Sequence, residues 1–212
     1  MLVGDRMSKP VVTIQPDLPL PEALNLMKKE HIRRMPVVKD GKLVGIVSDK
    51  DLLNASPSSA TSLSIWEINY LLSKVLVSEV MSGNVMTVTE DTPIEQAARI
   101  MADNKIGGLP VMRDGQVIGI ITETDLFKVF LELLGAREAG VRVTALIEDK
   151  PGRLAALTEA IAAKKGNFIA LGQFTDANLS NKIVTFKVKG LTLEETKETV
   201  GPVVKEILDI RS

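Results

Sequence analysis

The chain has no cysteine, which excludes disulfide bonds, thiolate nucleophiles and cysteine-ligated metals. Aromatic residues make up only 3% of it, so the core must be built mainly from Val, Ile, Leu, Ala and Met. The single histidine, His31, has no second histidine or carboxylate cluster nearby, and no metal site is predicted. Because no nucleophile–base pair can be assembled from these residues, we expect a protein that is not an enzyme.

Long apolar runs and a strong net charge are also missing. No apolar stretch approaches the roughly 18 residues that span a bilayer, and the first ten residues lack the apolar region of a signal peptide. The formal net charge is -1, without a long block of one sign. We therefore expect a cytoplasmic protein that binds no membrane and no nucleic acid.

What the sequence does contain is an internal repeat. When the chain is aligned with itself at a shift of 74 positions, residues 7–53 match residues 81–127 without a gap, and 17 of the 47 pairs are identical. The phrase GIVSDKDLL, which begins at Gly45, returns as GIITETDLF at Gly119. Agreement over this length indicates a tandem duplication.

Each copy predicts the element order β-α-β-β-α. Short extended segments at 11–14 and 85–88 precede amphipathic helices at 21–30 and 95–104. A hairpin follows in each copy and turns at Asp-Gly, a pair suited to a type I′ turn, before a second helix begins. One such unit is too small to bury a good core alone, so we expect the two copies to pack face to face.

Residues 56–80 separate the copies. Their first part is rich in Ser, Ala, Thr and Pro and predicts a linker. The second part predicts a helix with Ser64 as N-cap and Glu67 three residues later, which is a capping box. Trp66 and Tyr70 lie four residues apart on this helix. They either pack the helix onto the repeat pair, which is the interpretation we favour, or mark a partner or ligand surface.

After Gly135 the repeat ends, and a separate α+β domain with the order β-α-β-β-α-β is predicted. Alternating apolar residues from Val141 to Ile147 indicate its first strand, and Leu157 and Ile161 lie on a helical stripe. Gly166 is expected to end that helix, at the position where glycine is favoured. The predicted division is therefore repeat 1 at 1–55, linker and helix at 56–80, repeat 2 at 81–135 and the last domain at 140–212.

The repeated phrase places a hydroxyl residue three positions before an aspartate, as Ser48 and Asp51 and again as Thr122 and Asp125. One interpretation is a capping box at a helix start. The other is a ligand site, because a helix N-terminus favours phosphate and a fixed carboxylate accepts hydrogen bonds from both hydroxyls of a ribose. A cleft between the repeats, lined by Val and Ile, would then hold a purine. The two roles can coexist.

The full copies read MSKPVVTI…MPVVKDGKLVGIVSDKDL and MSGNVMTV…LPVMRDGQVIGIITETDL. They resemble a tandem pair of CBS domains, also called a Bateman module, over nearly all of residues 1–135. The motif G-h-x-(S/T)-x-x-D, in which h is apolar, is complete in both copies. The resemblance implies that an adenosine compound (AMP, ADP, ATP or S-adenosylmethionine) binds as a regulatory ligand in the cleft between the repeats.

The same resemblance implies a role for each part of the nucleotide site. Asp51 and Asp125 would hold ribose, Ser48 and Thr122 would meet ribose or phosphate, and backbone near 11–13 and 85–87 would line adenine. The predicted nucleotide-binding residues are Val11, Val12, Thr13, Arg33, Arg34, Met35, Pro36, Ser48, Asp51, Val85, Met86, Thr87, Leu109, Pro110, Thr122 and Asp125.

The copies differ just before the proline of each hairpin, where the first has Arg33-Arg34 and the second has Gly107-Gly108. Arginine binds phosphate oxygens well through its forked N–H donors. We therefore predict that both arginines contact phosphate and that the second copy's cleft is the weaker or less phosphate-dependent one. The alternative is that both are solvated residues at a helix end.

The C-terminal part has Asp149-Lys150-Pro151-Gly152-Arg153-Leu154 between a strand and a helix, and Gly166-Asn167-Phe168-Ile169 at the next strand. It resembles an ACT domain. The resemblance implies a ferredoxin-like fold, a homodimer, and an amino-acid effector site at Asp149, Pro151, Gly152, Arg153 and Leu154. The alternative is a tight β-to-α turn, with Pro151 near the first helical position and Gly152 easing the start of the helix.

The order CBS–CBS–ACT, with the linker phrase SPSSATSLSIWEINYLLSK, is similar to bacterial acetoin-utilisation protein B-like proteins over the whole chain. The implied fold class is α/β (α+β), with two packed β-α-β-β-α repeats before the β-α-β-β-α-β domain. The leading hypothesis is a non-catalytic regulatory protein that senses an adenosine nucleotide and acts on an unidentified regulated protein. The alternative is a structural adaptor that dimerises and binds no small molecule.

Overall fold

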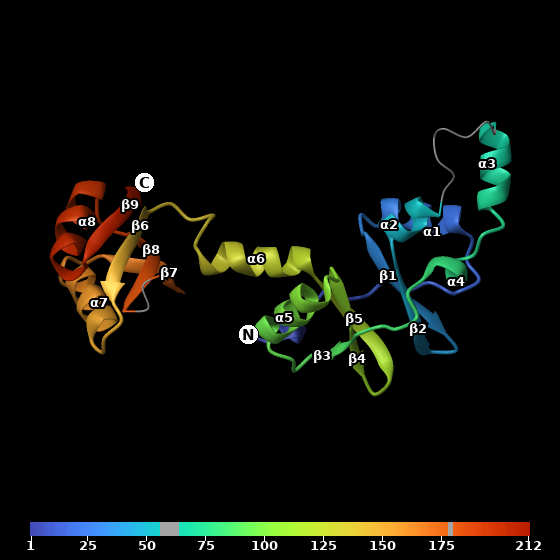
Figure 1. Ribbon diagram of the computed structural model, residues 1–212, viewed down its shortest axis with the longest axis horizontal. Coiled ribbons are helices and arrows are strands. Elements are labelled where there is room, and N and C mark those ends of the chain that lie inside the picture. The colour runs from blue at the N-terminus through green and yellow to red at the C-terminus, as the bar shows by residue number, and fades with distance from the viewer. Residues whose placement is uncertain (56–63, 178–179) are drawn as a thin grey trace. The chain divides into compact units, whose positions relative to one another are not determined.

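The computed structural model describes residues 1–55, 64–177 and 180–212 (Figure 1). The chain divides into two compact units, Met1–Leu126 (unit 1) and Phe127–Ser212 (unit 2). The division falls within helix α6 (Glu123–Leu133). The predicted Ser/Ala/Thr/Pro linker at 56–63 lies outside the described residues.

Unit 1 contains both repeats. The predicted order holds, except that the first strand of the first repeat is reduced to a single parallel bridge between Ile14 and Val37. Its elements are η1 (Val3–Asp5), α1 (Leu20–Lys29), β1 (Arg34–Lys39), β2 (Lys42–Ser48), α2 (Asp49–Asn54), α3 (Ile65–Leu72), α4 (Val77–Val80), β3 (Val88–Thr89), α5 (Ile94–Asn104), β4 (Gly108–Arg113), β5 (Gln116–Thr122) and the start of α6. The buried stripes of α1 and α5 pack on these hairpins, as the helical pattern predicts.

The hairpins turn as predicted. In the first, Lys39 pairs with Lys42, which leaves the two-residue loop Asp40-Gly41 with φ angles of 51° and 76°. The second hairpin repeats this loop at Asp114-Gly115 with φ angles of 51° and 79°. Both central residues of a type I′ turn need positive φ, and Gly adopts it without a Cβ clash while Asp tolerates it.

The leading segment of each sequence repeat packs in the other repeat. Met7 opens the first repeat, yet its sulfur occupies the place where a Cβ on Gly119 of the second would lie. Met81 opens the second repeat and does the same at Gly45 of the first. The glycine that begins each repeated phrase is therefore needed for this close approach. Because the exchange is mutual, it joins the two repeats into one unit.

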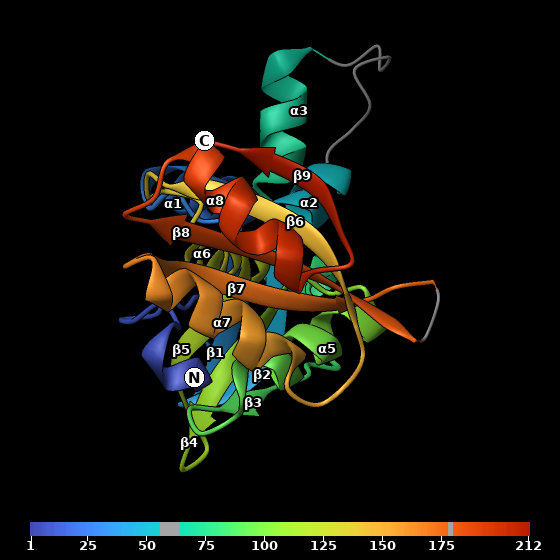
Figure 2. The same ribbon diagram turned by 90° about the vertical axis from the view of Figure 1, so that its left-hand side faces the viewer.

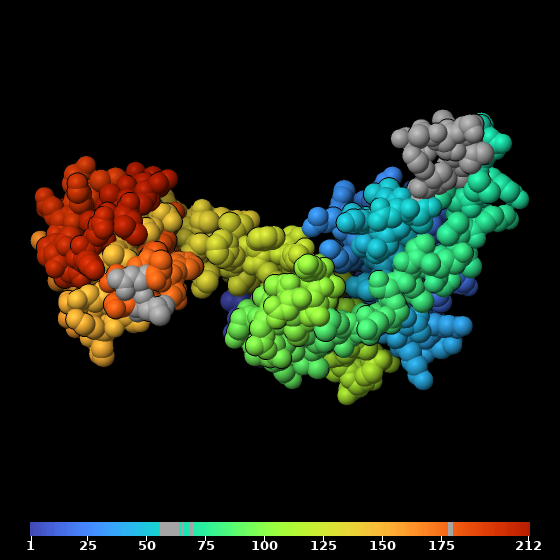
Figure 3. Space-filling model, viewed as in Figure 1, coloured from blue at the N-terminus to red at the C-terminus, as the bar shows by residue number. Residues whose placement is uncertain are grey.

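Helix α3 has the predicted cap but not the predicted packing. The backbone N–H of Ser64 donates to Glu67 Oε2 at 2.8 Å, and the N–H of Glu67 donates to Ser64 Oγ at 3.3 Å. Trp66 and Tyr70, however, are 85% and 64% exposed, on a helix at the outside of unit 1 (Figure 3). The interpretation that these aromatic residues pack α3 onto the repeats was wrong. Leu72, about 200° around the helix from Tyr70, reaches the core instead.

Unit 2 has the element order predicted for it. Its elements after α6 are β6 (Val141–Glu148), α7 (Arg153–Ala163), β7 (Asn167–Thr175), β8 (Asn181–Lys189), α8 (Leu193–Val200), η2 (Gly201–Val203) and β9 (Glu206–Arg211). The strands form an antiparallel sheet in the order β7-β8-β6-β9. Helices α7 and α8 lie on one face of this sheet (Figure 2), where Val143, Leu157 and Phe186 belong to the buried core.

The end of α7 corrects one prediction. Lys165, with φ of 64°, takes the left-handed position that we assigned to Gly166. The N–H of Gly166 then donates to the carbonyl of Ile161 at 3.0 Å, which closes the helix. A Cβ on Gly166 would lie 2.8 Å from Leu191 Cδ1 and 2.9 Å from Ile161 Cγ2. Glycine is needed there for space and not for its conformation.

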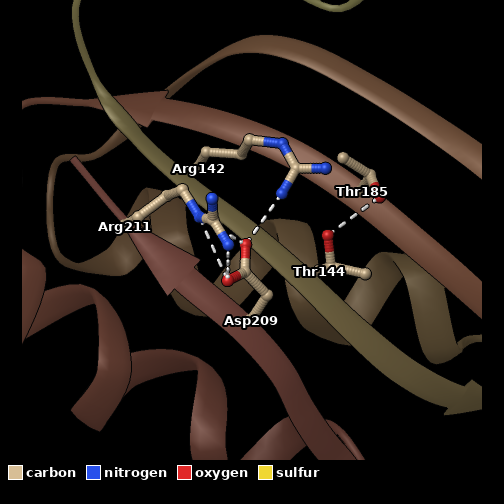
Figure 4. Close-up of polar contacts among 5 residues, drawn as sticks. All are labelled: Arg142, Thr144, Thr185, Asp209 and Arg211. Atoms are coloured by element: carbon tan, nitrogen blue, oxygen red, sulfur yellow. Dashed lines mark hydrogen bonds and ion pairs between the residues drawn. The ribbon is translucent and has the colours of Figure 1, made fainter.

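The sheet face opposite α7 and α8 carries a polar cluster (Figure 4). Arg142 of β6 donates to Asp209 Oδ2 of β9 at 2.8 Å, and Arg211 Nε donates to the same oxygen at 2.9 Å. The hydrogen bonds from Arg211, with the charges of both arginines, hold the pKa of Asp209 below its ordinary value. Beside them the hydroxyls of Thr144 and Thr185 are 3.1 Å apart and link β6 to β8. The cluster therefore ties three neighbouring strands together across their polar face.

Candidate functional site

The first copy of the repeated phrase turns β2 into α2. Ser48 is the N-cap of α2, and its N–H and hydroxyl donate to Asp51 Oδ2 at 2.8 Å and 2.6 Å. The N–H of Asp51 donates back to Ser48 Oγ at 3.3 Å. The capping-box interpretation is therefore confirmed at this position. These bonds use one carboxylate oxygen, and among the described residues no hydrogen bond is made to Asp51 Oδ1.

The second copy builds the same turn from β5 into α6. The N–H and hydroxyl of Thr122 donate to Asp125 Oδ2 at 3.0 Å and 2.7 Å. Asp125 is only 6% exposed, whereas Asp51 is half-buried. Each repeat thus holds one carboxylate in a fixed orientation beside the N-terminus of a helix. The N-terminus of a helix carries the positive end of the helix dipole.

The arginine pair of the first repeat lies against the second repeat. Arg33 Nη2 donates to Thr124 Oγ1 at 3.2 Å. The guanidinium of Arg34 occupies the place where a Cβ on Gly107 would lie, so it fills the room that the missing side chain leaves. Both guanidinium groups therefore lie beside the repeated phrase of the second copy. That the second copy's cleft is the weaker or less phosphate-dependent one stays a prediction. The alternative of two solvated helix-end residues does not describe Arg34, which is half-buried at the start of β1.

The other predicted nucleotide-binding residues lie on segments around these turns. Arg34 pairs with Ser48 across the β1–β2 hairpin, so the arginine and the cap are neighbours. The N–H of Ile14 donates to the carbonyl of Pro36 at 3.1 Å, which brings the segment 11–13 alongside β1. Met35, Pro36, Leu109 and Pro110 are buried, Val11, Val12 and Val85 are half-buried, and Thr13, Met86 and Thr87 are exposed.

Three residues at this junction were not among the predicted site residues: Gly107, Gly108 and Thr124. The glycines were noted only as positions without arginine. The loss of two successive side chains in an otherwise matched repeat is nevertheless a signal. It marks a place where the other repeat needs room. No comparable signal in the sequence points to Thr124, which is reached only across the fold.

The residues predicted to bind an amino acid surround a cavity at the β6–α7 loop. Asp149, Pro151, Gly152, Arg153 and Leu154 all line this cavity, which has a volume of about 200 Å³. Gly152, with φ of 86°, is the N-cap of α7. Pro151 therefore precedes the cap, and the alternative that placed it near the first helical position was wrong by two residues.

An ion pair between Glu148 and Arg153 lies beside this cavity. Both residues also line a second cavity of about 300 Å³. Lys150 Nζ lies 3.2 Å from Glu148 Oε1, and the hydrogen bonds from Arg153 and then Lys150 hold the pKa of Glu148 below its ordinary value. The loop thus presents a carboxylate and cations to the same small space.

The two repeats are similar to known proteins in sequence and in structure. The model of the CBS domain family matches residues 3–58 and 77–132. The CBS domain pair of MJ0100, solved in complex with 5′-methylthioadenosine and S-adenosyl-L-methionine, is 32% identical with a TM-score of 0.52, over 65% of this chain and 98% of that one. CBSX2 in complex with AMP is 31% identical with a TM-score of 0.52, over 62% and 97% of the two chains. A Vibrio cholerae protein that carries the name AcuB, after acetoin utilization, is 33% identical with a TM-score of 0.53, over 65% of this chain and 95% of that one.

The family match ends at residue 132 and does not reach the sheet of unit 2, which begins at β6. Within the described ranges, no helix is long and apolar enough to cross a membrane. The same residues hold no group of three or more His, Asp or Glu side chains that could bind a metal ion. The matched residues make up more than half of the sequence. The chain therefore belongs to the CBS domain family and carries two of its domains in tandem.

Proposed function

We propose that this protein is a non-catalytic regulator that binds an adenosine nucleotide in the cleft between its two CBS domains. The observation that carries the proposal is the pair of oriented carboxylates, Asp51 and Asp125, each held by a neighbouring N–H and hydroxyl. The ligands named for the related structures, AMP, 5′-methylthioadenosine and S-adenosyl-L-methionine, share an adenosine with two ribose hydroxyls. A carboxylate accepts hydrogen bonds from such a pair of hydroxyls.

The regulatory step follows from this binding mode. The ligand contacts both repeats, so it favours whichever packing of the repeats brings its contacts together. A ligand shifts such an equilibrium only by the difference between its affinities for the two states. A regulated partner protein then binds one packing of the repeats more tightly than the other. This role requires no bond making or breaking, and the site offers an acceptor and cations but no nucleophile–base pair.

A binding panel on the purified protein tests the proposal. We expect at least one of AMP, ADP, ATP, S-adenosylmethionine or adenosine to raise the midpoint of thermal unfolding, with guanosine as the control. A ligand at 100 times its Kd stabilises the folded state by about 2.7 kcal/mol, which corresponds to several degrees. If none of these compounds shifts the midpoint, the repeated phrases act as helix caps only. The dimerising adaptor is then the better description.

We further propose that residues 140–212, within unit 2, form an ACT domain with a ferredoxin-like fold. The supporting observations are its β-α-β-β-α-β order and its antiparallel sheet with β7 and β9 at the edges. The cavity at Asp149–Leu154 favours an amino-acid effector, because the Glu148–Arg153 ion pair beside it offers a partner for each charge of a zwitterion. Adding single amino acids to the same thermal panel tests this second input.

We also propose that the protein is a homodimer joined through unit 2. Phe174 on edge strand β7 and Leu208 on edge strand β9 are each 46% exposed. Sheet edges with exposed apolar side chains are typical of surfaces where another chain binds. We expect sedimentation velocity to give a mass of two chains, and the double variant Phe174→Glu/Leu208→Glu to give one. If Leu53→Glu in unit 1 dissociates the dimer instead, the interface lies in the repeats.

A further inference from the structure

Equivalent positions of the two repeats meet at Arg34 and Gly108. The shift of 74 residues aligns these positions in the sequence. In the structure, Arg34 Cδ lies 3.3 Å from the point where a Cβ on Gly108 would stand. Two positions that are related by the repeat and also touch must lie at the axis that relates the repeats. A long side chain on one of them therefore takes the space of the other.

Residues of the second repeat surround the side chain of this arginine. The guanidinium of Arg34 occupies the place of a Cβ on Gly107. Thr122 Cγ2 is 3.4 Å from the Cβ position of Gly108, so the arginine runs beside the cap of the second phrase. Its own backbone pairs with Ser48, the cap of the first phrase. One arginine thus stands between the two phrases that carry the proposed ribose acceptors.

The guanidinium of Arg34 has no hydrogen bond and no ion pair among the described residues, although the residue is half-buried. Glu123 Oε2 lies 2.8 Å from the point where a Cβ on Gly107 would stand, without forming an ion pair with the arginine. Arg33 beside it is held by Thr124. None of its side-chain nitrogens is buried without a partner, so water reaches them, and its five N–H donors remain open to a ligand. An anion with several oxygens accepts hydrogen bonds from such a fork of donors, and phosphate fits this geometry well.

We propose that the two adenosine sites of the pair share one phosphate seat, formed by Arg34 in the room left by Gly107 and Gly108. Each chain then binds one phosphorylated adenosine compound, and its other site takes an adenosine compound without a phosphate. The seat cannot be duplicated, because a second arginine at position 108 would overlap the first. Two phosphates at one seat would also repel each other. This inference rests on the proposed function and specifies its ligands.

Calorimetric titration with ADP and with adenosine tests the seat. The wild-type protein should bind one ADP but two adenosine molecules per chain. In Arg34→Ala, ADP affinity should fall roughly ten- to a hundredfold, the range expected when hydrogen bonds to a charged group are lost. Adenosine affinity should stay within about threefold, because adenosine does not use the guanidinium.

Two glycine substitutions extend the test, Gly107→Ala as a second disrupting variant and Gly83→Ala as its matched control. Gly107→Ala keeps the arginine and its charge but places a methyl group where the guanidinium lies. The guanidinium is the free end of a flexible side chain, so it moves away and the fold is kept. ADP affinity should fall as in Arg34→Ala. Gly83→Ala, whose added Cβ has no heavy atom within 4 Å, should bind both compounds like the wild type.

An exchange variant tests the placement of the seat at the axis. Exchanging both pairs, with Arg33→Gly and Arg34→Gly combined with Gly107→Arg and Gly108→Arg, moves the long side chain and the room beside it to the equivalent positions. We expect the wild-type preference for ADP over adenosine to be kept in this variant. Two ADP molecules per wild-type chain, or an unchanged preference in Arg34→Ala and Gly107→Ala, would overturn the shared seat while leaving adenosine binding intact. If the wild type binds neither compound, the proposed function fails and the seat fails with it.

Discussion

Asp51→Ala is expected to weaken adenosine binding at the first site about a hundredfold, and Asp125→Ala to do the same at the second. Each substitution removes an acceptor for two ribose hydroxyls, and a hydrogen bond to a charged group contributes about 1.5–3 kcal/mol. A hundredfold loss corresponds to about 2.8 kcal/mol, slightly less than the roughly 3 kcal/mol that two such bonds contribute at the low end of this range. Titration with adenosine measures this effect without the phosphate, so it is independent of the arginines.

Asp51 also caps α2, so loss of binding must be separated from loss of folding. Ser48→Ala removes the cap hydroxyl but leaves the carboxylate. It should lower the free energy of unfolding by about 1 kcal/mol, and its loss of affinity should be smaller than that of Asp51→Ala, because the charged acceptor remains. Asp51→Asn keeps an oxygen that accepts from the N–H of Ser48, yet it lacks the charge. We expect it to retain most of the stability and to lose most of the binding. If Asp51→Asn binds adenosine with wild-type affinity, the carboxylate of Asp51 serves only as a helix cap.

Phe186→Ala is expected to destabilise unit 2 by about 3–5 kcal/mol, the range for removing a buried aromatic side chain. The ring is 1% exposed, and its centroid lies 5.5 Å from that of Phe168 in the core beneath α7 and α8. For a domain of this size about 1 kcal/mol lowers Tm by 4–8 °C, so the unit 2 transition should fall by more than 10 °C. Scanning calorimetry measures this shift.

Phe130→Ala is the matched control, because it removes the same side chain from a position of the same unit that is 51% exposed. Its effect should stay below about 1 kcal/mol. The transition of unit 1, which is identified by its response to the nucleotide, should not move in either variant, since unit 2 has a separate core. If both transitions fall together in Phe186→Ala, the two units unfold cooperatively and do not have independent stabilities.

Local signals predicted much of this fold. The Asp40-Gly41 turn, the buried stripe of α1 and the cap at Ser48 each depend on residues within a few positions of one another. Backbone preference, helical periodicity and capping act over that range and are therefore visible in one sequence. The pairs Ser48/Asp51 and Thr122/Asp125 were found in this way, although the pattern alone left a cap and a ligand site equally open.

Other predictions were wrong because the same type of residue can serve more than one structural role. Gly166 was expected to supply a left-handed conformation, but Lys165 does so, and the glycine instead leaves room for Leu191. Trp66 and Tyr70 were expected to pack inward because they are large and apolar, yet Leu72 on another side of α3 makes that contact. In both cases the outcome depends on a contact with a residue that lies outside the local sequence pattern.

The sequence by itself determined the duplication, the order of elements in each copy and the carboxylate at the start of α2 and of α6. Only the tertiary structure decided that Met7 and Met81 pack in the opposite repeats, and that Arg34 lies on the second repeat. These are contacts between residues far apart in the chain, which local preferences do not specify. Where equivalent positions meet at the axis between the repeats, excluded volume allows one long side chain, so a nearly symmetric sequence folds into an asymmetric site.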